Sequence, residues 1–330
     1  MFTIAEVGQS HEGSLGLALS YIDALSETGV DAVKFQVHIA EAESSTYEPF
    51  RIKFSQQDKT RFDYWKRMEF SKEEWGLLKA RCEETGVEFL ASPFSNAAVD
   101  LLEELGVKRY KIGSGEVNNL LLMERVAQTG KSVILSSGMS SLKELDRTVG
   151  FLKEKGIDVS VLQCTTSYPT SPENYGLNVI NELKERYKVP VGYSDHSARI
   201  ETCIAATALG AEILEFHATF SRKSFGPDAT SSLEIEEVKE LVKAVGNISK
   251  AIHNPVNKKD NSSFTDLKEI FEKSLAVNKD LKAGYVLTFA DLEAKKPKSK
   301  GIHAVDFQKV IGRELKSDIN KWDFLTDGHI

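Results

Sequence analysis

The sequence predicts an α/β protein whose larger part is a (β/α)8 TIM barrel, followed by a small C-terminal domain. Short apolar runs rich in β-branched residues recur eight times between residues 2 and 216. Segments with apolar residues three and four positions apart lie between most of these runs. Strands that are apolar on both faces and alternate with helices form parallel sheets, and eight such units close a barrel of about 250 residues. An open doubly wound sheet is the alternative built from the same elements.

The eight runs define the expected strands in chain order. They span residues 2–7, 31–36, 87–92, 108–113, 132–137, 159–164, 189–194 and 211–216, with central residues Ile4, Val33, Phe89, Tyr110, Ile134, Leu162, Val191 and Ile213. Helical spacing is clearest in residues 14–30, 96–107 and 140–157. Each of these segments ends close to a glycine, which favours the left-handed conformation that terminates many helices.

Two segments depart from this alternation. Residues 40–70, between the second and third expected strands, form a long irregular insertion. Such an insertion after a barrel strand lies over the active-site mouth, so we expect a loop that covers the substrate. The alternation stops near Ile252, where a polar stretch rich in Asn and Lys has the character of a linker. We predict a barrel over residues 1–252, a linker over 253–270 and a small domain over 271–330.

Composition points to a small-molecule partner. The 330 residues carry a formal net charge of -7, which provides no basic surface for nucleic acid or an anionic membrane. The three cysteines lie far apart without metal-binding spacing, which is typical of reduced thiols. The N-terminus lacks the features of a signal peptide, and no apolar run reaches the length of a membrane span. We therefore expect a cytoplasmic protein.

Polar residues close the eight expected strands, and in a barrel these ends converge on one mouth. They are Glu6, Lys34, Gln36, Ser92, Lys111, Ser114, Glu116, Ser136, Ser137, Thr165, Tyr168, Ser194, His196 and His217. Two lysines, several hydroxyls and the glycine-rich turn at residues 113–116 suit an anion with phosphate and carboxylate groups. An ammonium group buried in the mouth would be costly without such an anion.

The two histidines that end neighbouring strands allow two interpretations. A single His after an apolar run is more often a hydrogen-bonded structural residue, whereas His196 and His217 together resemble a half-open site for Mn²⁺ or another divalent ion. His11, just past the first strand, could point into the same mouth. His38, His253, His303 and His329 have no such placement. No dinucleotide or phosphate-binding loop motif supports a nucleotide.

The motifs in their order resemble the sialic acid synthase family, which includes N-acetylneuraminate, legionaminate and pseudaminate synthases. The resemblance rests on IAEVGQSHEGS, VKFQVHIAEAE, SPFSNAAVDLL, YKIGSGEVNN, LSSGMSS, CTTSYPT, GYSDHS and EFHATF with the later FGPD. The C-terminal segment from Lys273 resembles the antifreeze-like (SAF) domain attached to these enzymes. The resemblance therefore covers nearly the whole chain.

The resemblance implies a C–C bond-forming transferase. Phosphoenolpyruvate would condense with the open-chain aldehyde of an N-acylated hexosamine such as N-acetylmannosamine, giving a nine-carbon 2-keto sugar acid and phosphate. It further implies Mn²⁺ at His196 and His217, and a homodimer in which the C-terminal domain of one subunit covers the barrel mouth of the other. Phosphoenolpyruvate would be held by Lys34, Ser92, Lys111, Ser114, Ser136 and Ser194. The sugar would lie near Glu6, Gln36, Tyr168 and Asp228, and Glu116 would be a proton-transfer group.

Departures from the family pattern fall on the sugar side. Thr166 replaces an Asn common in N-acetylneuraminate synthases, and the early motif has QSHEG in place of NHNG. The insertion places Gln56 near where an Asn would touch the sugar, and Lys296 stands where an Arg of the C-terminal domain would contact it. A lysine keeps the charge but loses the planar bidentate fork. The reaction type is therefore better determined than the substrate.

Three alternatives remain open from sequence. A Schiff-base aldolase or lyase would use Lys34 or Lys111 as a nucleophile without a metal. A non-catalytic homologue would bind the sugar without releasing phosphate. A sugar-phosphate acceptor would need a further basic cluster that the expected mouth does not obviously supply.

Overall fold

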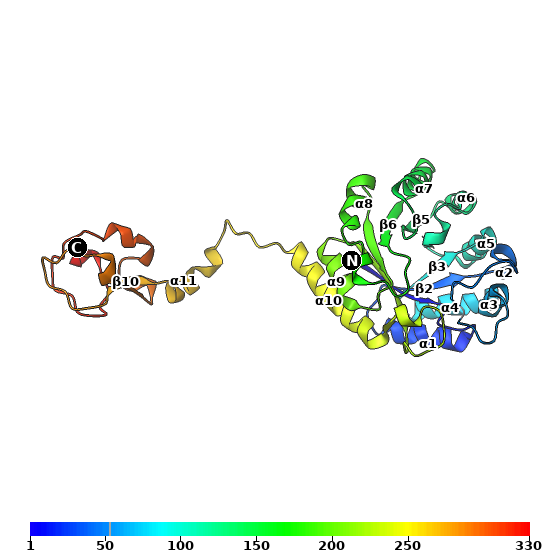
Figure 1. Ribbon diagram of the computed structural model, residues 1–330, viewed down its shortest axis with the longest axis horizontal. Coiled ribbons are helices and arrows are strands. Elements are labelled where there is room, and N and C mark those ends of the chain that lie inside the picture. Colours follow the sequence, from blue (N-terminus) through cyan, green and yellow to red (C-terminus); the bar gives the residue numbers. More distant parts are fainter. Residues whose placement is uncertain (53) are drawn as a thin grey trace. The chain divides into compact units, whose positions relative to one another are not determined.

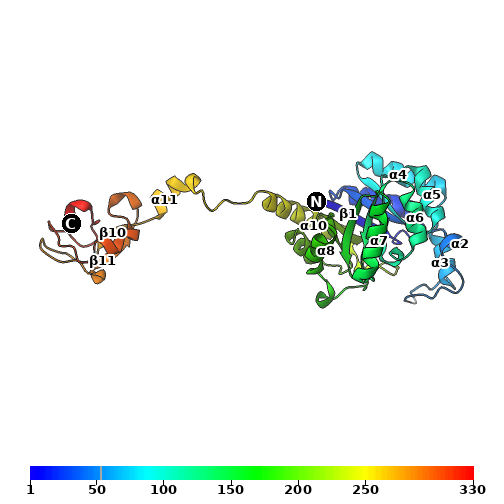
Figure 2. The ribbon, with the colours of Figure 1, turned by 90° about the horizontal axis from the view of Figure 1, so that it is seen from above.

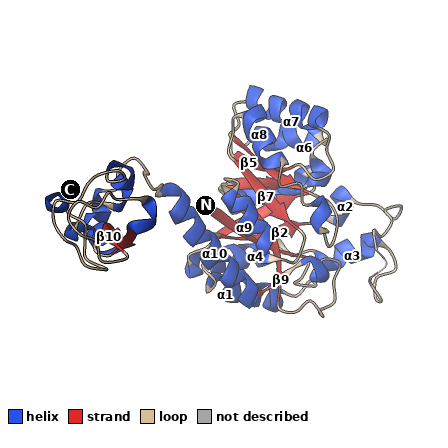
Figure 3. Ribbon diagram, turned by 60° about the vertical axis from the view of Figure 1, so that its left-hand side comes forward, coloured by secondary structure: helices blue, strands red, loops and turns tan. Residues whose placement is uncertain are grey.

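The computed structural model describes residues 1–52 and 54–330. The chain forms two compact units, residues 1–254 and 255–330. In the first unit, eight parallel strands form the centre and helices surround them (Figure 1, and in red and blue in Figure 3). The hydrogen-bonded order β3-β2-β1-β8-β7-β6-β5-β4 brings β3 and β4 side by side, although no backbone ladder joins these two in the described residues. The predicted (β/α)8 barrel is confirmed, and the open doubly wound sheet is excluded.

Every expected strand contains its predicted central residue. The strands are β1 (Phe2–Gly8), β2 (Ala32–Val37), β3 (Glu88–Pro93), β4 (Arg109–Ile112), β5 (Ser132–Ser136), β6 (Val159–Cys164), β7 (Val191–Asp195) and β8 (Ile213–Thr219), with a short β9 (Leu233–Glu234) beside β8. The surrounding helices are α1 (Leu15–Ser26), α4 (Lys72–Thr85), α5 (Asn96–Leu105), α6 (Leu120–Ala127), α7 (Leu142–Glu154), α8 (Val179–Tyr187), α9 (Ile200–Ala208) and α10 (Ile235–His253). The insertion after β2 adds α2 (Ala40–Glu43) and α3 (Arg61–Met68).

Local sequence signals explain where the helices begin and end. Helix α4 begins after Ser71, whose hydroxyl accepts a hydrogen bond from the Glu74 backbone N–H, while the Glu74 carboxylate accepts one from the Ser71 N–H. This reciprocal capping satisfies two backbone donors at the helix start. The helix ends at Gly86, which has a φ of 81°. That left-handed conformation is one that glycine adopts without steric cost.

An apolar layer closes the barrel interior beneath the mouth. Ile4, Ala32, Leu90, Ile134, Leu162 and Ile213 form this buried layer. Because side chains alternate along a strand, the residues two positions further on point into the same interior, nearer the carboxyl ends. They are Glu6, Lys34, Ser92, Ser136, Cys164 and Glu215. The polar residues of the mouth therefore rest directly on an apolar floor that excludes water from below.

The second unit has its own small core. Helix α11 (Thr265–Phe271) occupies part of the stretch that the sequence assigns to a linker. Strands β10 (Ser274–Val277) and β11 (Leu292–Lys295) pair antiparallel (Figure 2). Their inner side chains pack with those of the following loops, including Leu275, Leu287 and Leu325.

Two findings bear on the chemical character of the chain. Cys82, Cys164 and Cys203 are buried and unpaired with one another. No helix in the described residues combines the length and apolar character needed to cross a membrane.

Because the floor is tightly packed, we expect substitution of Gly192 on β7 to lower the stability of the protein. A Cβ atom there would lie 2.2 Å from the Ile213 carbonyl oxygen and 2.6 Å from the Leu162 side chain. We expect Gly192→Ala to lower the free energy of unfolding by about 1–3 kcal/mol, the usual cost of overpacking a core. Gly150→Ala in α7 is the matched control, since a Cβ there meets nothing within 4 Å. Urea unfolding that shows equal stability for both variants would contradict the tight floor.

Candidate active site

A cavity of about 460 Å³ opens at the carboxyl ends of the strands. It is lined by most of the residues that the sequence singled out: Glu6, Lys34, Gln36, Ser92, Lys111, Ser114, Glu116, Ser136, Tyr168, Ser194, His196, His217 and Asp228. They come from seven of the eight barrel strands, the turns that follow them and the loop after β8. The barrel therefore gathers residues far apart in sequence around one space.

Lys34 on β2 is held among polar groups from β1 and β3. Its ammonium nitrogen lies 2.6 Å from Oε2 of Glu6 and donates to the Ser92 hydroxyl at 3.2 Å. The other carboxylate oxygen of Glu6 accepts a hydrogen bond from the Gln36 amide at 2.7 Å. Burial lowers the pKa of Lys34, but the carboxylates of Glu215 and Glu6 outweigh it and raise the pKa above its ordinary value. Lys34 is thus a buried, permanently charged ammonium group.

Lys111 on β4 has an equivalent arrangement across the barrel. Its ammonium donates to the Ser136 hydroxyl at 2.8 Å and lies 3.1 Å from Oε1 of Glu215, which also accepts from Ser194. Burial would raise the pKa of Glu215, but the lysines Lys111 and Lys34 hold it below its usual range. Glu215 was not predicted from the sequence because it lies inside an apolar run. Its position could have identified it, because a residue two positions before His217 lies on the same face of β8.

His196 and His217 lie next to each other at the ends of β7 and β8. Their ring centroids are 5.2 Å apart, and both side chains are buried. Burial and the neighbouring His217 hold the pKa of His196 well below its ordinary value, so its imidazole is neutral at pH 7. Nδ1 of His217 is buried and has no hydrogen-bond partner in the described residues. An orphaned nitrogen beside a neutral imidazole is what a divalent metal ion would satisfy.

The pair would bind a metal with an incomplete set of protein ligands. The described residues contain no group of three His, Cys, Asp or Glu side chains arranged to hold a metal. Two imidazoles would therefore leave the other coordination positions to water or substrate oxygens, as in catalytic sites. In their chemistry and position, His196 and His217 fit the divalent ion that the sequence suggested.

Ser114 and Glu116 come from the glycine-rich turn after β4. The Ser114 hydroxyl accepts a hydrogen bond from the Gly138 backbone N–H at 3.0 Å. The Glu116 carboxylate accepts one from the Asn119 amide at 2.7 Å, and burial raises the pKa of Glu116. A carboxyl group whose pKa is shifted toward neutrality is suited to exchanging a proton.

The insertion after β2 forms one wall of the cavity. The Arg51 guanidinium lies over the Tyr168 ring, 4.1 Å from its centroid, and 3.1 Å from the Asp228 carboxylate. Arg61 also lines the cavity and pairs with Glu48 at 2.9 Å. Neither arginine was predicted from the sequence, because the insertion has no regular period that indicates which side chains face inward.

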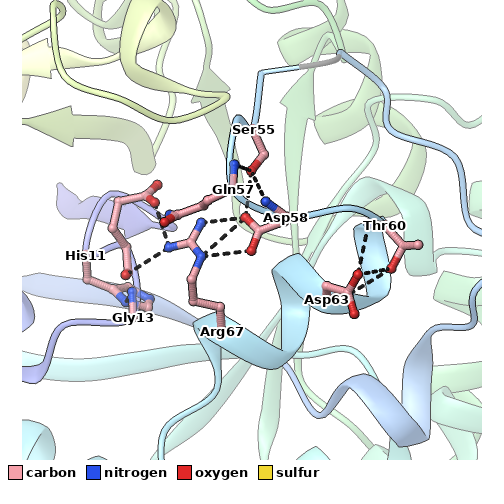
Figure 4. A network of polar contacts seen from close by, with 9 residues as sticks. His11, Gly13, Ser55, Gln57, Asp58, Thr60, Asp63 and Arg67 are labelled. Atoms are coloured by element: carbon pink, nitrogen blue, oxygen red, sulfur yellow. Dashed lines mark hydrogen bonds and ion pairs between the residues drawn. The ribbon is translucent and has the colours of Figure 1, made fainter.

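Arg67 on α3 ties the insertion to the loop after β1. Its guanidinium forms a fork with the Asp58 carboxylate and also donates to the backbone carbonyl and carboxylate of Glu12 (Figure 4). Planar bidentate pairing of this kind fixes both distance and orientation. The insertion is thus anchored beside the mouth at a defined position.

Three sequence-based placements need correction. His11 does not line the cavity, because its ring packs on Phe70 and its Nδ1 accepts from the Gly13 N–H. Gln56 is exposed and lies outside the cavity, because the Ser55–Asp58 hydrogen bonds turn the chain there. His38, which had no assigned placement, lines the cavity.

Lys296 belongs to the second unit. It lies directly after β11, where its ammonium is 4.8 Å from the centre of the Phe271 ring.

The buried charges predict a specific loss of stability. Glu215→Leu removes the carboxylate next to Lys111, so we expect the free energy of unfolding at pH 7 to fall by about 3–5 kcal/mol. The double variant Glu215→Leu/Lys111→Met removes both charges and should recover much of this loss. Denaturant titration checks both. A double variant as unstable as Glu215→Leu would show that packing, not charge, determines the loss.

Sequence comparison identifies relatives over almost the whole chain. The chain is 34% identical over 316 residues to the N,N'-diacetyllegionaminic acid synthase of Campylobacter jejuni, covering 94% of each chain. It is 32% identical to the human N-acetylneuraminate-9-phosphate synthase, covering 99% of this chain and 91% of the relative. A solved N-acetylneuraminic acid (sialic acid) synthetase from Leptospira borgpetersenii has 35% identity and a TM-score of 0.71, covering 81% of this chain and 89% of that one.

Both units match known families. Residues 21–257 match the NeuB family, and residues 272–330 match the SAF domain. The relatives are named as synthases, which agrees with an enzyme that forms C–C bonds. The chain therefore belongs to the NeuB family of sialic acid synthases and carries a C-terminal SAF domain.

Proposed function

We propose that this protein condenses phosphoenolpyruvate with the open-chain aldehyde of an N-acylated hexosamine. The methylene carbon of phosphoenolpyruvate bonds to the aldehyde carbon, and the aldehyde oxygen takes a proton to become a hydroxyl. Water adds to the former enol carbon, and phosphate leaves to give the 2-keto acid. The observation that carries the proposal is the pair of buried ammonium groups, each beside a serine hydroxyl, in the same cavity as two adjacent imidazoles.

Lys34 and Lys111 are suited to binding the anionic substrate. Each ammonium already contacts a serine, so the pocket presents preoriented donors and loses little entropy when an anion arrives. Ser114 and Ser194 add two further hydroxyls to the same lining. We assign phosphoenolpyruvate to this group of residues: Lys34, Ser92, Lys111, Ser114, Ser136 and Ser194.

The same lysines argue against a Schiff-base aldolase. A nucleophilic lysine must lose its proton, and this requires a lowered pKa. Burial lowers the pKa of Lys34, but Glu215 and Glu6 more than compensate and raise it. Lys111 is likewise paired with a carboxylate, since its ammonium nitrogen lies 3.1 Å from Oε1 of Glu215. Both lysines are therefore better placed to bind an anion than to attack a carbonyl.

We propose His196 and His217 as ligands of Mn²⁺ or a similar divalent ion. When bound, such an ion polarises an aldehyde oxygen and orients water. Lys34 and Lys111, and also Arg51 and Arg61, each already face a carboxylate. A phosphate-bearing substrate therefore calls for additional positive charge, and the two imidazoles provide a place for it.

We assign the acceptor sugar to the side of the cavity formed by Glu6, Gln36, Tyr168 and Asp228. Glu116 is the proposed proton-transfer group, because its pKa is raised by burial and it lines the same space. The names of the relatives differ in the sugar, and one specifies a 9-phosphate product. Phosphoenolpyruvate supplies three of the nine carbons, so that phosphate corresponds to position 6 of the hexosamine.

An unphosphorylated acceptor fits this cavity better. Arg51 contacts Tyr168 and Asp228, and Arg61 lines the same cavity, yet each arginine already faces a carboxylate, of Asp228 and Glu48 respectively. A 6-phosphate would have to share an arginine with its carboxylate, and such a neutralised pair leaves little net positive charge to attract it. We therefore expect N-acetylmannosamine or a diacetamido-trideoxyhexose to be preferred over N-acetylmannosamine 6-phosphate.

The SAF domain is proposed to act in a homodimer. A small unit with a limited core gains stability by docking on another surface, and a cover over the partner's barrel would exclude water. In that arrangement Lys296 would reach the sugar of the partner subunit. Subunits carrying Lys296→Ala and subunits carrying His217→Ala should then complement each other when mixed.

The proposed function is tested by phosphate release. We expect the protein, supplied with phosphoenolpyruvate and Mn²⁺, to release phosphate only when an N-acylated hexosamine is present. The panel contains N-acetylmannosamine, its 6-phosphate and diacetamido-trideoxyhexoses, and mass spectrometry identifies the keto acid. Sugar binding without phosphate release would favour the non-catalytic homologue. A protein trapped on a lysine by borohydride with a carbonyl substrate would favour the aldolase.

If His196 and His217 bind the metal, replacing either one should remove both the bound metal and the activity. His196→Ala and His217→Ala should each remove stoichiometric Mn²⁺, measured by elemental analysis, and reduce phosphate release at least about 10²-fold. Both residues lie at the cavity rim but their side chains are buried, so the metal-free variants should unfold in one cooperative transition at a moderately lower Tm. His253→Ala, on the exposed end of α10, is the control. Full metal content in both rim variants would exclude these ligands.

A further inference from the structure

We infer that His38 is a positioning residue, which holds the Gln36 amide in the one orientation that engages Glu6. This inference rests on the proposed function, in which Gln36 and Glu6 form the acceptor side of the cavity. His38 lies one residue beyond β2 and was not assigned a role by its place in the sequence. Its importance emerges from the contacts around its ring.

The His38 ring is clamped between two aromatic side chains. It stacks on Trp65 of α3 with ring centroids 3.9 Å apart and on Phe94 with centroids 4.6 Å apart, at interplanar angles of 20° and 16°. The His38 side chain is only 4% exposed. Stacking on both faces fixes the plane of the ring, and both ring nitrogens form their hydrogen bonds within that plane.

Glu43 of α2 determines the hydrogen on one nitrogen. Its Oε1 lies 2.6 Å from Nδ1 of His38, and the Glu43 side chain is 7% exposed. A carboxylate only accepts hydrogen bonds, so Nδ1 carries the hydrogen and donates it. Nε2 is therefore the nitrogen that is available to the groups on the other side of the ring.

Nε2 faces two glutamines. In a neutral imidazole it accepts from the Gln9 amide nitrogen at 3.5 Å, and that nitrogen also donates to the Gln36 carbonyl oxygen at 2.5 Å. In a protonated imidazole, Nε2 donates directly to the Gln36 oxygen at 3.2 Å. In the neutral form Nε2 acts on Gln36 only through the Gln9 amide, because Nε2 and the Gln36 oxygen are then both acceptors. In the protonated form Nε2 holds that oxygen directly.

The amide nitrogen of Gln36 is then turned toward Glu6. It donates to Oε1 of Glu6 at 2.7 Å, while Oε2 of Glu6 contacts Lys34 at 2.6 Å. If the amide of Gln36 were reversed, its oxygen would face the Glu6 carboxylate, and two acceptors would repel each other. A continuous chain of contacts thus runs from Glu43 through His38 and Gln36 to Glu6. The chain fixes which groups Gln36 presents to an acceptor.

The test separates the imidazole from its packing. Glu43→Gln is the control, because its amide oxygen still accepts from Nδ1 and leaves no buried charge if His38 is then changed. The double variant Glu43→Gln/His38→Phe keeps an aromatic ring between Trp65 and Phe94 but lacks both nitrogens. We expect the acceptor KM of the double variant to rise about 10-fold to 100-fold over the control, the effect of one hydrogen bond to a charged group. The phosphoenolpyruvate KM should rise much less than the acceptor KM, because Lys34 keeps its contact with Glu6 and the Lys111 contacts are unaltered.

A second readout is independent of catalysis. The side-chain NH2 signal of Gln36 in the NMR spectrum, assigned by its loss in Gln36→Leu, should be a single sharp pair in the wild type and control. It should shift or broaden in the double variant, as the amide becomes free to rotate. If wild-type protein releases no phosphate with any acceptor, the proposed function fails and this signal alone decides the inference.

Two outcomes would overturn the inference. One is a double variant with the control's acceptor KM and an unchanged Gln36 signal. The other is an equal rise in both KM values with a drop in Tm of many degrees, which would give His38 a purely structural role.

Discussion

The buried ion pairs at the base of the mouth, Lys34 with Glu6 and Lys111 with Glu215, are the constraint on which the site depends. Charged groups this deeply buried persist only when each has a partner in good geometry. The barrel supplies that geometry through its register, in which Glu6 is paired with Lys34 on β2 and with His217 on β8. A shift of register by one residue would turn these side chains toward the helices. The strand register that closes the barrel therefore also assembles the anion pocket.

The apolar floor makes these pairs effective. Ile4, Leu90, Ile134, Leu162 and Ile213 exclude water from below, so each contact above acts in a medium of low polarity. Hydrogen bonds from Lys34 and Lys111 to their serines gain strength there. The same environment keeps His196 neutral, which a metal ligand requires. Floor, ion pairs and imidazoles thus form successive layers of the interior.

Much of the barrel could be predicted because side chains alternate between two faces along each strand. All eight strands, and the polar residues at their ends, follow from local pattern plus the convergence of strand ends in a barrel. Glu215 escaped notice because a charge within an apolar run looks like part of the core, and its partner Lys111 lies over one hundred residues away. Gln56 was misplaced because the conformation of its loop depends on the Arg67–Asp58 fork, a tertiary contact. Arg51, Arg61 and His38 likewise depend on how the insertion folds back.

The division between barrel and insertion also separates two kinds of chemistry. Groups assigned to phosphoenolpyruvate project from strands or the tight turns that follow them, where backbone hydrogen bonding allows little movement. The acceptor side instead draws on Arg51, which reaches Tyr168 and Asp228 from the insertion. Side-chain contacts join the insertion to the rest of the barrel, among them Arg67 with Glu12 and Phe54 with Phe225. Substitutions in the insertion are therefore expected to change acceptor selectivity without displacing the groups that project from the strands. His38 is one place where they meet, since it joins the Glu43 carboxylate of the insertion to Gln36 on β2.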